Sequence, residues 1–184
     1  RFVRWETLRG CPYRCTFCQF KIEAMKPEQL AHQRVFAELE LFHRQGVQEI
    51  ALLDPIFNFQ ESHYIPILEK ITELGMTAKF SIQARLELLT RKHGRRFLEW
   101  CRDYGNVHLE FGVQTFNKKE SDEVQRGNHL GQIERGIALL HEYEVSFDLH
   151  LIIGLPFQTY GSFSESYEKA LNFQPHQLYV YPLN

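Results

Sequence analysis

Short apolar segments rich in β-branched and aromatic residues alternate along this chain with segments of helical periodicity, and this alternation constrains the fold most. Six segments predict strands, at residues 2–8, 47–53, 77–82, 106–113, 146–153 and 177–181. Each gap can hold a helix, and crossovers of that length make neighbouring strands parallel and their connections right-handed. We therefore predict an α/β fold whose six parallel strands curve toward a barrel. A complete eight-unit barrel needs roughly 200 residues or more, so a chain of 184 residues does not hold eight units.

The predicted helices have start and stop signals as well as apolar faces. Pro27 suits a helix start, and Gly46 suits the residue after a helix end. The last helix is expected to start near Ser162 and to bury Phe163, Tyr167 and Ala170. Because no linker or second domain is visible, we expect residues 1–184 to be one domain. The chain starts at Arg1 without a methionine and stops after a strand-like run, so we also expect it to be part of a larger protein.

Composition narrows the classes of partner. The net charge of −2 supplies no basic field of the kind that nucleic-acid binding usually needs, so nucleic-acid binding is unsupported. No apolar run approaches the roughly 20 residues of a membrane span, and no charged-then-apolar leader opens the chain. We therefore expect a cytoplasmic protein.

Three of the four cysteines, Cys11, Cys15 and Cys18, lie within eight residues. This spacing lets one loop wrap three thiolates around one metal centre, as in iron-sulfur ligation. Cys101 is distant in sequence, so a [4Fe-4S] cluster held by the three would keep one iron free of protein ligands. The alternative is a structural zinc site with Cys101 or a histidine as fourth ligand. The spacing makes a poor disulfide framework and favours reducing surroundings.

The loop, with an aromatic residue before its last cysteine, resembles the signature of the radical S-adenosylmethionine (SAM) superfamily. That resemblance implies a [4Fe-4S] cluster whose open iron binds the amino and carboxylate groups of SAM. It also implies an open, partial (β/α)6 barrel of the TIM type, with six strands and five helices present and the last helix absent. The preceding residues, Glu6-Thr7-Leu8-Arg9-Gly10, are most similar to the branch whose members often carry a separate cobalamin-binding domain.

Two further segments resemble SAM-binding parts of this superfamily. Residues 112–117 match the Gly-Val-Gln-x-Phe-Asn segment of the oxygen-independent coproporphyrinogen oxidase group, and an arginine follows the glutamine by twelve residues in both. By that match Gln114 would bond the SAM ribose and Arg126 would hold its carboxylate, which a guanidinium binds well. Arg126 as an ordinary surface arginine is the alternative. Gly154-Leu155-Pro156 resembles the turn that passes under the adenine, where only glycine allows close backbone approach.

Two residues near other strand ends have competing interpretations. By resemblance, Phe17 would pack beside the cluster and the adenine, and it could equally be an apolar anchor for the loop. Asp54 stands where many members carry Gly-Gly-Glu and could accept from the SAM ammonium group. A helix cap or a turn is the alternative role for Asp54.

Polar residues also lie on the strands themselves. Ser81 and Gln83 share one face, and Ser81 stands where the oxidase group has a SAM-contacting glutamate. By resemblance, His150 stands where relatives usually carry the ribose-binding aspartate, and Asp148, on the same face, is the residue that would compensate. Glu110 is expected to be an interior acid, either paired or serving the substrate.

The favoured hypothesis is a radical SAM core that reductively cleaves SAM to a 5'-deoxyadenosyl radical for hydrogen abstraction from an unknown substrate. The resemblance also implies an electron donor such as a flavodoxin or a ferredoxin. One alternative is a cobalamin-assisted radical SAM methyltransferase, using a domain outside this chain. The other is a non-catalytic, zinc-stabilised binding module.

Overall fold

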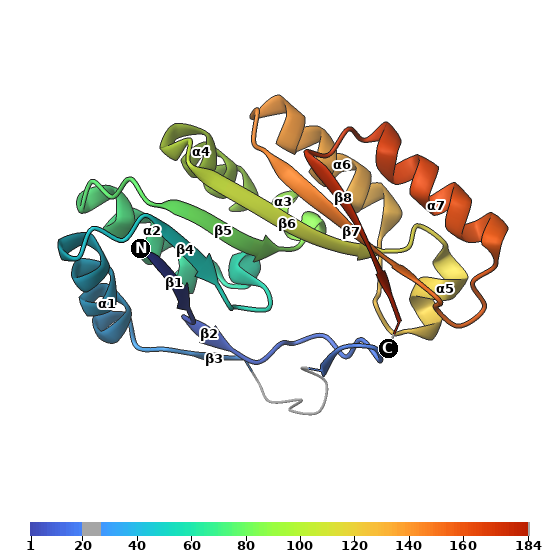
Figure 1. The fold of residues 1–184 in the computed structure, drawn as a ribbon, viewed down its shortest axis with the longest axis horizontal. Coiled ribbons are helices and arrows are strands. Elements are labelled where there is room, and N and C mark those ends of the chain that lie inside the picture. The colour runs from blue at the N-terminus through green and yellow to red at the C-terminus, as the bar shows by residue number, and fades with distance from the viewer. Residues whose placement is uncertain (20–26, 184) are drawn as a thin grey trace.

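A computed structural model describes residues 1–19 and 27–183 of the chain, and its centre is one parallel sheet of six strands (Figure 1). The strand order is β1-β4-β5-β6-β7-β8, and every neighbouring pair is parallel. The strands are β1 (Phe2–Trp5), β4 (Glu49–Leu52), β5 (Lys79–Ala84), β6 (Val107–Gln114), β7 (Phe147–Ile153) and β8 (Gln177–Pro182). All six predicted strands are therefore present.

Side chains alternate between the two faces of this sheet. On β5, Phe80 and Ile82 are buried, whereas Ser81 and Gln83 are accessible. This period of two buries one face under the helices and leaves the other, concave face accessible (Figure 1). The buried face carries most of the hydrophobic core, with Ile50, Leu109, Phe111 and Leu149 at its centre.

The helices fill the crossovers between strands, as the alternation predicts. They are α1 (His32–Arg44), α2 (Glu61–Glu73), α3 (Leu86–Leu89), α4 (Gly94–Tyr104), α5 (Lys118–Glu123), α6 (Leu130–Glu142) and α7 (Tyr160–Asn172), with a 3-10 turn η2 (Phe57–Phe59). The short helices α3 and α5 were not predicted. No helix follows β8 within the described residues, and β1 and β8 form the two edges of the sheet. The prediction of an open, partial barrel is confirmed.

The prediction that the first helix starts at Pro27 is wrong. The residues after Pro27 form strand β3 (Glu28–Gln29), which pairs antiparallel with β2 (Leu8–Arg9), and α1 begins only at His32. The N–H of Leu30 also donates to the carbonyl of Thr7 at 3.0 Å. These backbone bonds hold the segment extended, so tertiary pairing overrides the local helix signal.

The predicted buried face of α7 is also partly wrong. Tyr167 is 39% exposed, whereas Ser166 and Ala170 are buried. The helix is rotated so that the Ser166 hydroxyl accepts from the N–H of Phe116 at 3.1 Å. The helix starts at Tyr160, two residues before the predicted start, because Thr159 and Ser162 form a capping box there.

Among the described residues, none of the helices combines the length and apolar character needed to cross a bilayer.

Candidate functional site

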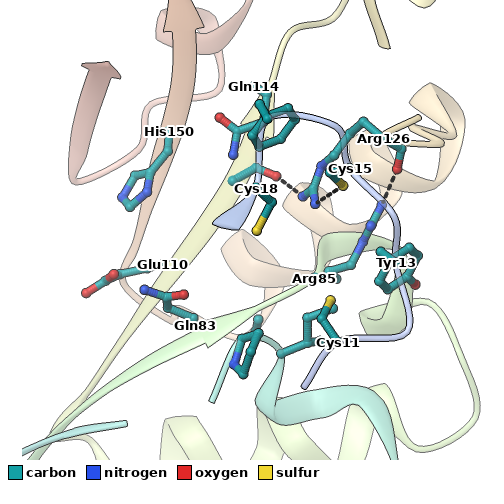
Figure 2. A pocket seen from close by; sticks show the side chains of 15 residues that line it. Cys11, Tyr13, Cys15, Cys18, Gln83, Arg85, Glu110, Gln114, Arg126 and His150 are labelled. Carbon is teal, nitrogen blue, oxygen red and sulfur yellow. Dashed lines mark hydrogen bonds between the residues drawn. The ribbon is translucent and has the colours of Figure 1, made fainter. Parts of the chain in front are cut away.

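The cysteine loop lies at the carboxyl ends of the strands and borders a pocket of about 170 Å³. Cys11, Cys15 and Cys18 all line this pocket (Figure 2). The loop is held by backbone bonds, from the N–H of Cys18 to Cys15 at 3.1 Å and from the N–H of Thr16 to Val124 at 2.9 Å. Burial raises the pKa of the Cys11 thiol above its usual value. Three sulfur ligands are thus presented to one cavity.

The fourth cysteine is not part of this site. Cys101 lies on α4, is 3% exposed and packs in the hydrophobic core, where burial strongly raises its pKa. The interpretation of Cys101 as a fourth zinc ligand is therefore wrong. In residues 1–19 and 27–183, no three His, Cys, Asp or Glu side chains are grouped closely enough for one metal ion.

Two arginines border the same pocket. Arg85 makes a two-pronged ion pair with Glu87, with Nε to Oε2 at 3.2 Å and Nη2 to Oε1 at 2.7 Å. Its guanidinium carbon lies 3.8 Å from the ring centre of Tyr13 in the cysteine loop. Arg126 donates from Nη1 to the Cys15 sulfur at 3.8 Å and from Nη2 to the carbonyl of Gly112. Figure 2 shows both guanidinium groups beside the cysteine loop.

The arginine charges are only partly balanced. Burial lowers the pKa of Arg85, but the ion pair with Glu87 outweighs burial and holds it above its usual value. Burial and then repulsion from Arg85 lower the pKa of Arg126. Arg85 Nη1 and Arg126 Nε are buried without a hydrogen-bond partner in the described part of the chain. Because unsatisfied buried donors are costly, this corner is suited to an anionic group.

Gln114 reaches the pocket through a break in the strand pattern. The register of β6 against β7 shifts between Gly112 and Gln114, and Gln114 has a positive φ of 72°. Such a bulge redirects a side chain at a strand end. Gly112 leaves room for it, because a Cβ there would lie 2.3 Å from Gln114 Nε2. Gln114 lines both this pocket and a neighbouring one, and Phe17 and His150 also line both.

An apolar wall joins the cysteine loop to the end of β7. Phe17 packs against a small cluster that contains Ile152, Leu155 and Val124. Gly154 has a φ of 95°, which a side chain would strain, and its N–H donates to Gln158 Oε1 at 2.6 Å. Phe17 therefore anchors the loop, which is one of its two interpretations, and it also lines the pocket.

The structure brings Phe17, Gln83, Gln114, Arg126 and His150 to the pocket with the three cysteines. Leu155 lies behind Phe17, and Gly154 lies at the adjacent turn. Neither Leu155 nor Gly154 lines the pocket itself, and Asp54 and Ser81 do not line it either. Ser81 does share the accessible face with Gln83, but it lies two residues farther from the strand end.

Asp54 has another role than either of those predicted. It is completely buried and accepts from the N–H groups of Thr7 and Leu8, at 2.7 and 3.0 Å, and from the Thr7 hydroxyl. It therefore fastens the chain that leads into the cysteine loop to the end of β4. His63 completes this buried group, with Nε2 2.9 Å from the Thr7 hydroxyl oxygen.

Sequence reasoning missed Arg85, Glu87, Tyr13 and His63 as parts of the site or its support. Arg85 and Glu87 were detectable, because opposite charges two residues apart directly follow a predicted strand. The contact of Arg85 with Tyr13 and the contact of His63 with Thr7 join segments more than 50 residues apart. No local pattern signals them.

Comparisons with known proteins agree with this geometry. The profile of the Radical SAM superfamily matches residues 5–170. The anaerobic magnesium-protoporphyrin IX monomethyl ester cyclase of Cereibacter sphaeroides is 25% identical over 173 residues, which cover 91% of this chain and 28% of the cyclase. The cobalamin-dependent radical SAM methyltransferase TokK of Streptomyces tokunonensis is 25% identical over an alignment of 194 residues, covering 99% of this chain and 28% of TokK.

A solved structure shares the fold. The radical SAM methyltransferase TsrM from Kitasatospora setae superposes with a TM-score of 0.81 at 16% identity, covering 98% of this chain and 35% of TsrM. The chain thus spans about a third or less of the length of these proteins. The family match covers most of the chain, and the cysteine loop of the matched region lines the pocket. The chain belongs to the radical SAM superfamily, whose enzymes use a [4Fe-4S] cluster and SAM.

Proposed function

We propose that residues 1–184 are the catalytic core of a larger radical SAM enzyme and that Cys11, Cys15 and Cys18 hold a [4Fe-4S] cluster. The supporting observation is that three thiols share one pocket with two arginines, for which Glu87 is the single carboxylate partner among residues 1–19 and 27–183. When bound, the reduced cluster supplies one electron that breaks a carbon-sulfur bond of SAM, giving methionine and a 5'-deoxyadenosyl radical that takes hydrogen from a substrate.

The residues of the chain bind and orient SAM in this proposal. Arg126, with its unpartnered buried Nε, holds the SAM carboxylate, and Gln114 bonds the ribose. The apolar wall of Phe17 and Leu155, with the Gly154 turn beside it, receives the adenine. Arg85 keeps Tyr13 and the cysteine loop in place and adds positive charge beside the thiolates.

The proposal also requires surroundings and partners that supply electrons. Three free cysteines at an iron site suit a reducing, cytoplasmic compartment. A small one-electron carrier such as a flavodoxin or a ferredoxin is the electron donor in this proposal.

A second candidate is cobalamin-assisted methyl transfer by a domain outside this chain. It is favoured by TokK, which is described as cobalamin-dependent, and by TsrM, whose structure was solved with cobalamin and a [4Fe-4S] cluster. Measuring cobalamin binding to the full-length protein separates the two candidates.

Anaerobic reconstitution tests the core proposal. About four irons and four sulfides per chain are expected, with a broad visible absorption. A colourless protein that holds one zinc ion would overturn the proposal. SAM is then expected to change the electron paramagnetic resonance signal of the reduced cluster, because it binds at the open iron.

An arginine variant tests the SAM site. Arg126→Ala is expected to weaken SAM binding roughly 10- to 100-fold at an unchanged iron content, because a charge-assisted hydrogen bond is lost. Arg95→Ala is the matched control, since Arg95 is exposed on α4 and does not line the pocket. Equal SAM affinity in the two variants would contradict the assigned role of Arg126.

A further inference from the structure

The side of the pocket opposite the arginines has a different character. Gln83, Glu110 and His150 lie there, on β5, β6 and β7, and Figure 2 shows them across the cavity from Arg85 and Arg126. Gln83 and Glu110 are direct neighbours in the β5–β6 register. The pocket is therefore cationic beside the thiols and carries a carboxylate on its far wall.

The Glu110 carboxylate has no partner in the described part of the chain. Among the hydrogen bonds and ion pairs of the described residues, none involves the side chain of Glu110 or the side chain of Gln83. The side chains that could pair with Glu110 have other partners, since His108 bonds Asp148 at 2.7 Å and Arg85, across the cavity, bonds Glu87. A half-buried carboxylate without a partner has lost hydration that nothing replaces.

Other titratable groups on this face leave the charge of Glu110 in place. Burial lowers the pKa of His150, so this imidazole is neutral near pH 7 and does not balance Glu110. Lys79 lies four residues before Gln83 on β5, which places it roughly 13 Å away along the strand. The far wall is therefore negatively charged at neutral pH.

Aromatic rings stand beside His150, on β7, the strand that lies between them and Glu110. The rings of Tyr179 and Tyr181 on β8 lie 5.2 and 5.6 Å from His150 between centres and stack on each other at 6.1 Å. Both are exposed, at 38% and 47%. Exposed tyrosine faces near an anion favour a cation carried on an apolar or flat group.

We propose that Glu110, with Gln83 and the rings of Tyr179 and Tyr181, binds a protonated amine of the molecule that reacts here. Glu110 accepts hydrogen bonds from the ammonium group, Gln83 adds an amide acceptor, and the tyrosines pack against the attached apolar part. That the amine belongs to the reacting molecule rests on the proposed function. Glu110 lies two residues before Gly112 on β6, roughly 7 Å along the strand, and it is not among the residues to which the proposed function assigns SAM.

Probes of similar shape and different charge test the subsite. The anaerobically reconstituted chain with SAM is titrated with phenethylamine, 2-phenylethanol and 3-phenylpropionate, and binding is followed by ligand-observed nuclear magnetic resonance. The amine is expected to bind most tightly, and Glu110→Gln is expected to weaken it roughly 10-fold or more, as for a lost charge-assisted hydrogen bond. Glu168→Gln, at an exposed position on α7, is the matched control and is expected to bind like the unaltered chain.

The outcomes separate the two proposals. Equal binding of amine and alcohol, or unchanged amine binding by Glu110→Gln, would overturn the subsite. Loss of the SAM-induced change of the cluster signal in Glu110→Gln would also overturn it, because Glu110 would then serve SAM itself. If the chain binds no iron yet still prefers the amine through Glu110, the subsite stands and the radical SAM proposal fails.

Discussion

The buried pair of Arg85 and Glu87 offers the sharpest test of how the site is built. Their side chains are 2% and 10% exposed, so Arg85→Met leaves a buried carboxylate without its partner. Breaking such a pair costs about 3–5 kcal/mol of unfolding free energy, and loss of the Tyr13 contact adds about 1 kcal/mol. The total is a large part of the 5–15 kcal/mol that is typical of a whole domain. Glu87→Leu is expected to destabilise the chain similarly, because it leaves the buried Arg85 guanidinium without its carboxylate partner.

The double variant carries the test. Arg85→Met/Glu87→Leu is expected to recover most of the loss, because apolar replacement of a whole buried pair is often neutral or stabilising. Urea unfolding of the cluster-free, reduced chain measures each free energy by linear extrapolation. The exposed pair Lys118 and Asp122, at 79% and 55%, is the control, with a coupling of only about 0.3–0.5 kcal/mol. If the two single losses add up to the double loss within about 0.5 kcal/mol, the reasoning is refuted.

Acid weakens the same pair. Burial raises the pKa of Glu87, but the hydrogen bond and charge of Arg85 outweigh burial and hold it below its ordinary value of 4.5. The contribution of Glu87 is therefore fully present above pH 4.5 and is lost as the pH falls through the lower folded-state value. The difference between Arg85→Met and the unaltered chain is expected to shrink in that acid range.

Two further predictions concern stability and use the same urea assay. Burial lowers the pKa of His63 to about 4, so the contribution of His63 to the free energy of unfolding is present above pH 6.5 and is lost as the pH falls. Burial raises the pKa of Asp54 to about 6, so the contribution of Asp54 is present below pH 3.8 and is lost as the pH rises. Compared with the unaltered chain, His63→Leu is therefore expected to lose stability between pH 4 and pH 6, and Asp54→Asn is expected to gain stability over the same range. Parallel pH profiles of the two variants would contradict these assignments. Gly136→Ala is expected to cost about 1–3 kcal/mol, because its Cβ would lie 2.6 Å from the carbonyl oxygen of Leu86. On the same helix Gly131→Ala meets nothing within 4 Å and is expected to stabilise by about 0.5–1 kcal/mol, so equal effects would refute the packing argument.

The sequence was informative wherever a local period or spacing determined the result. The six strands follow from alternation, and the three cysteines share a pocket because one short loop carries them. Pro27 misled because the two-residue pairing of β2 with β3 has no periodic signal. Tyr167 misled because several positions of α7 could face the core, and the bond from Phe116 to Ser166 decides between them.

The site was harder to predict than the fold, because polar side chains choose partners across long sequence separations. The Asp54 carboxylate could accept hydrogen bonds from a ligand or from the backbone. The donors are the N–H groups of Thr7 and Leu8, which lie 46 or more residues earlier in the chain. Arg85 gains its importance from Tyr13, which lies in the cysteine loop, 72 residues earlier in the chain.

The accessible concave face of the sheet affects how large a reactant this scaffold can accommodate. Within the described residues, helices cover the opposite face, and β8 at the open edge presents Tyr179, Val180 and Tyr181 to solvent. A long or branched molecule can therefore lie across the strands and insert only one end beside the cysteine loop. In the proposed function, the described residues would then position the reacting atom and contact only that end of the molecule.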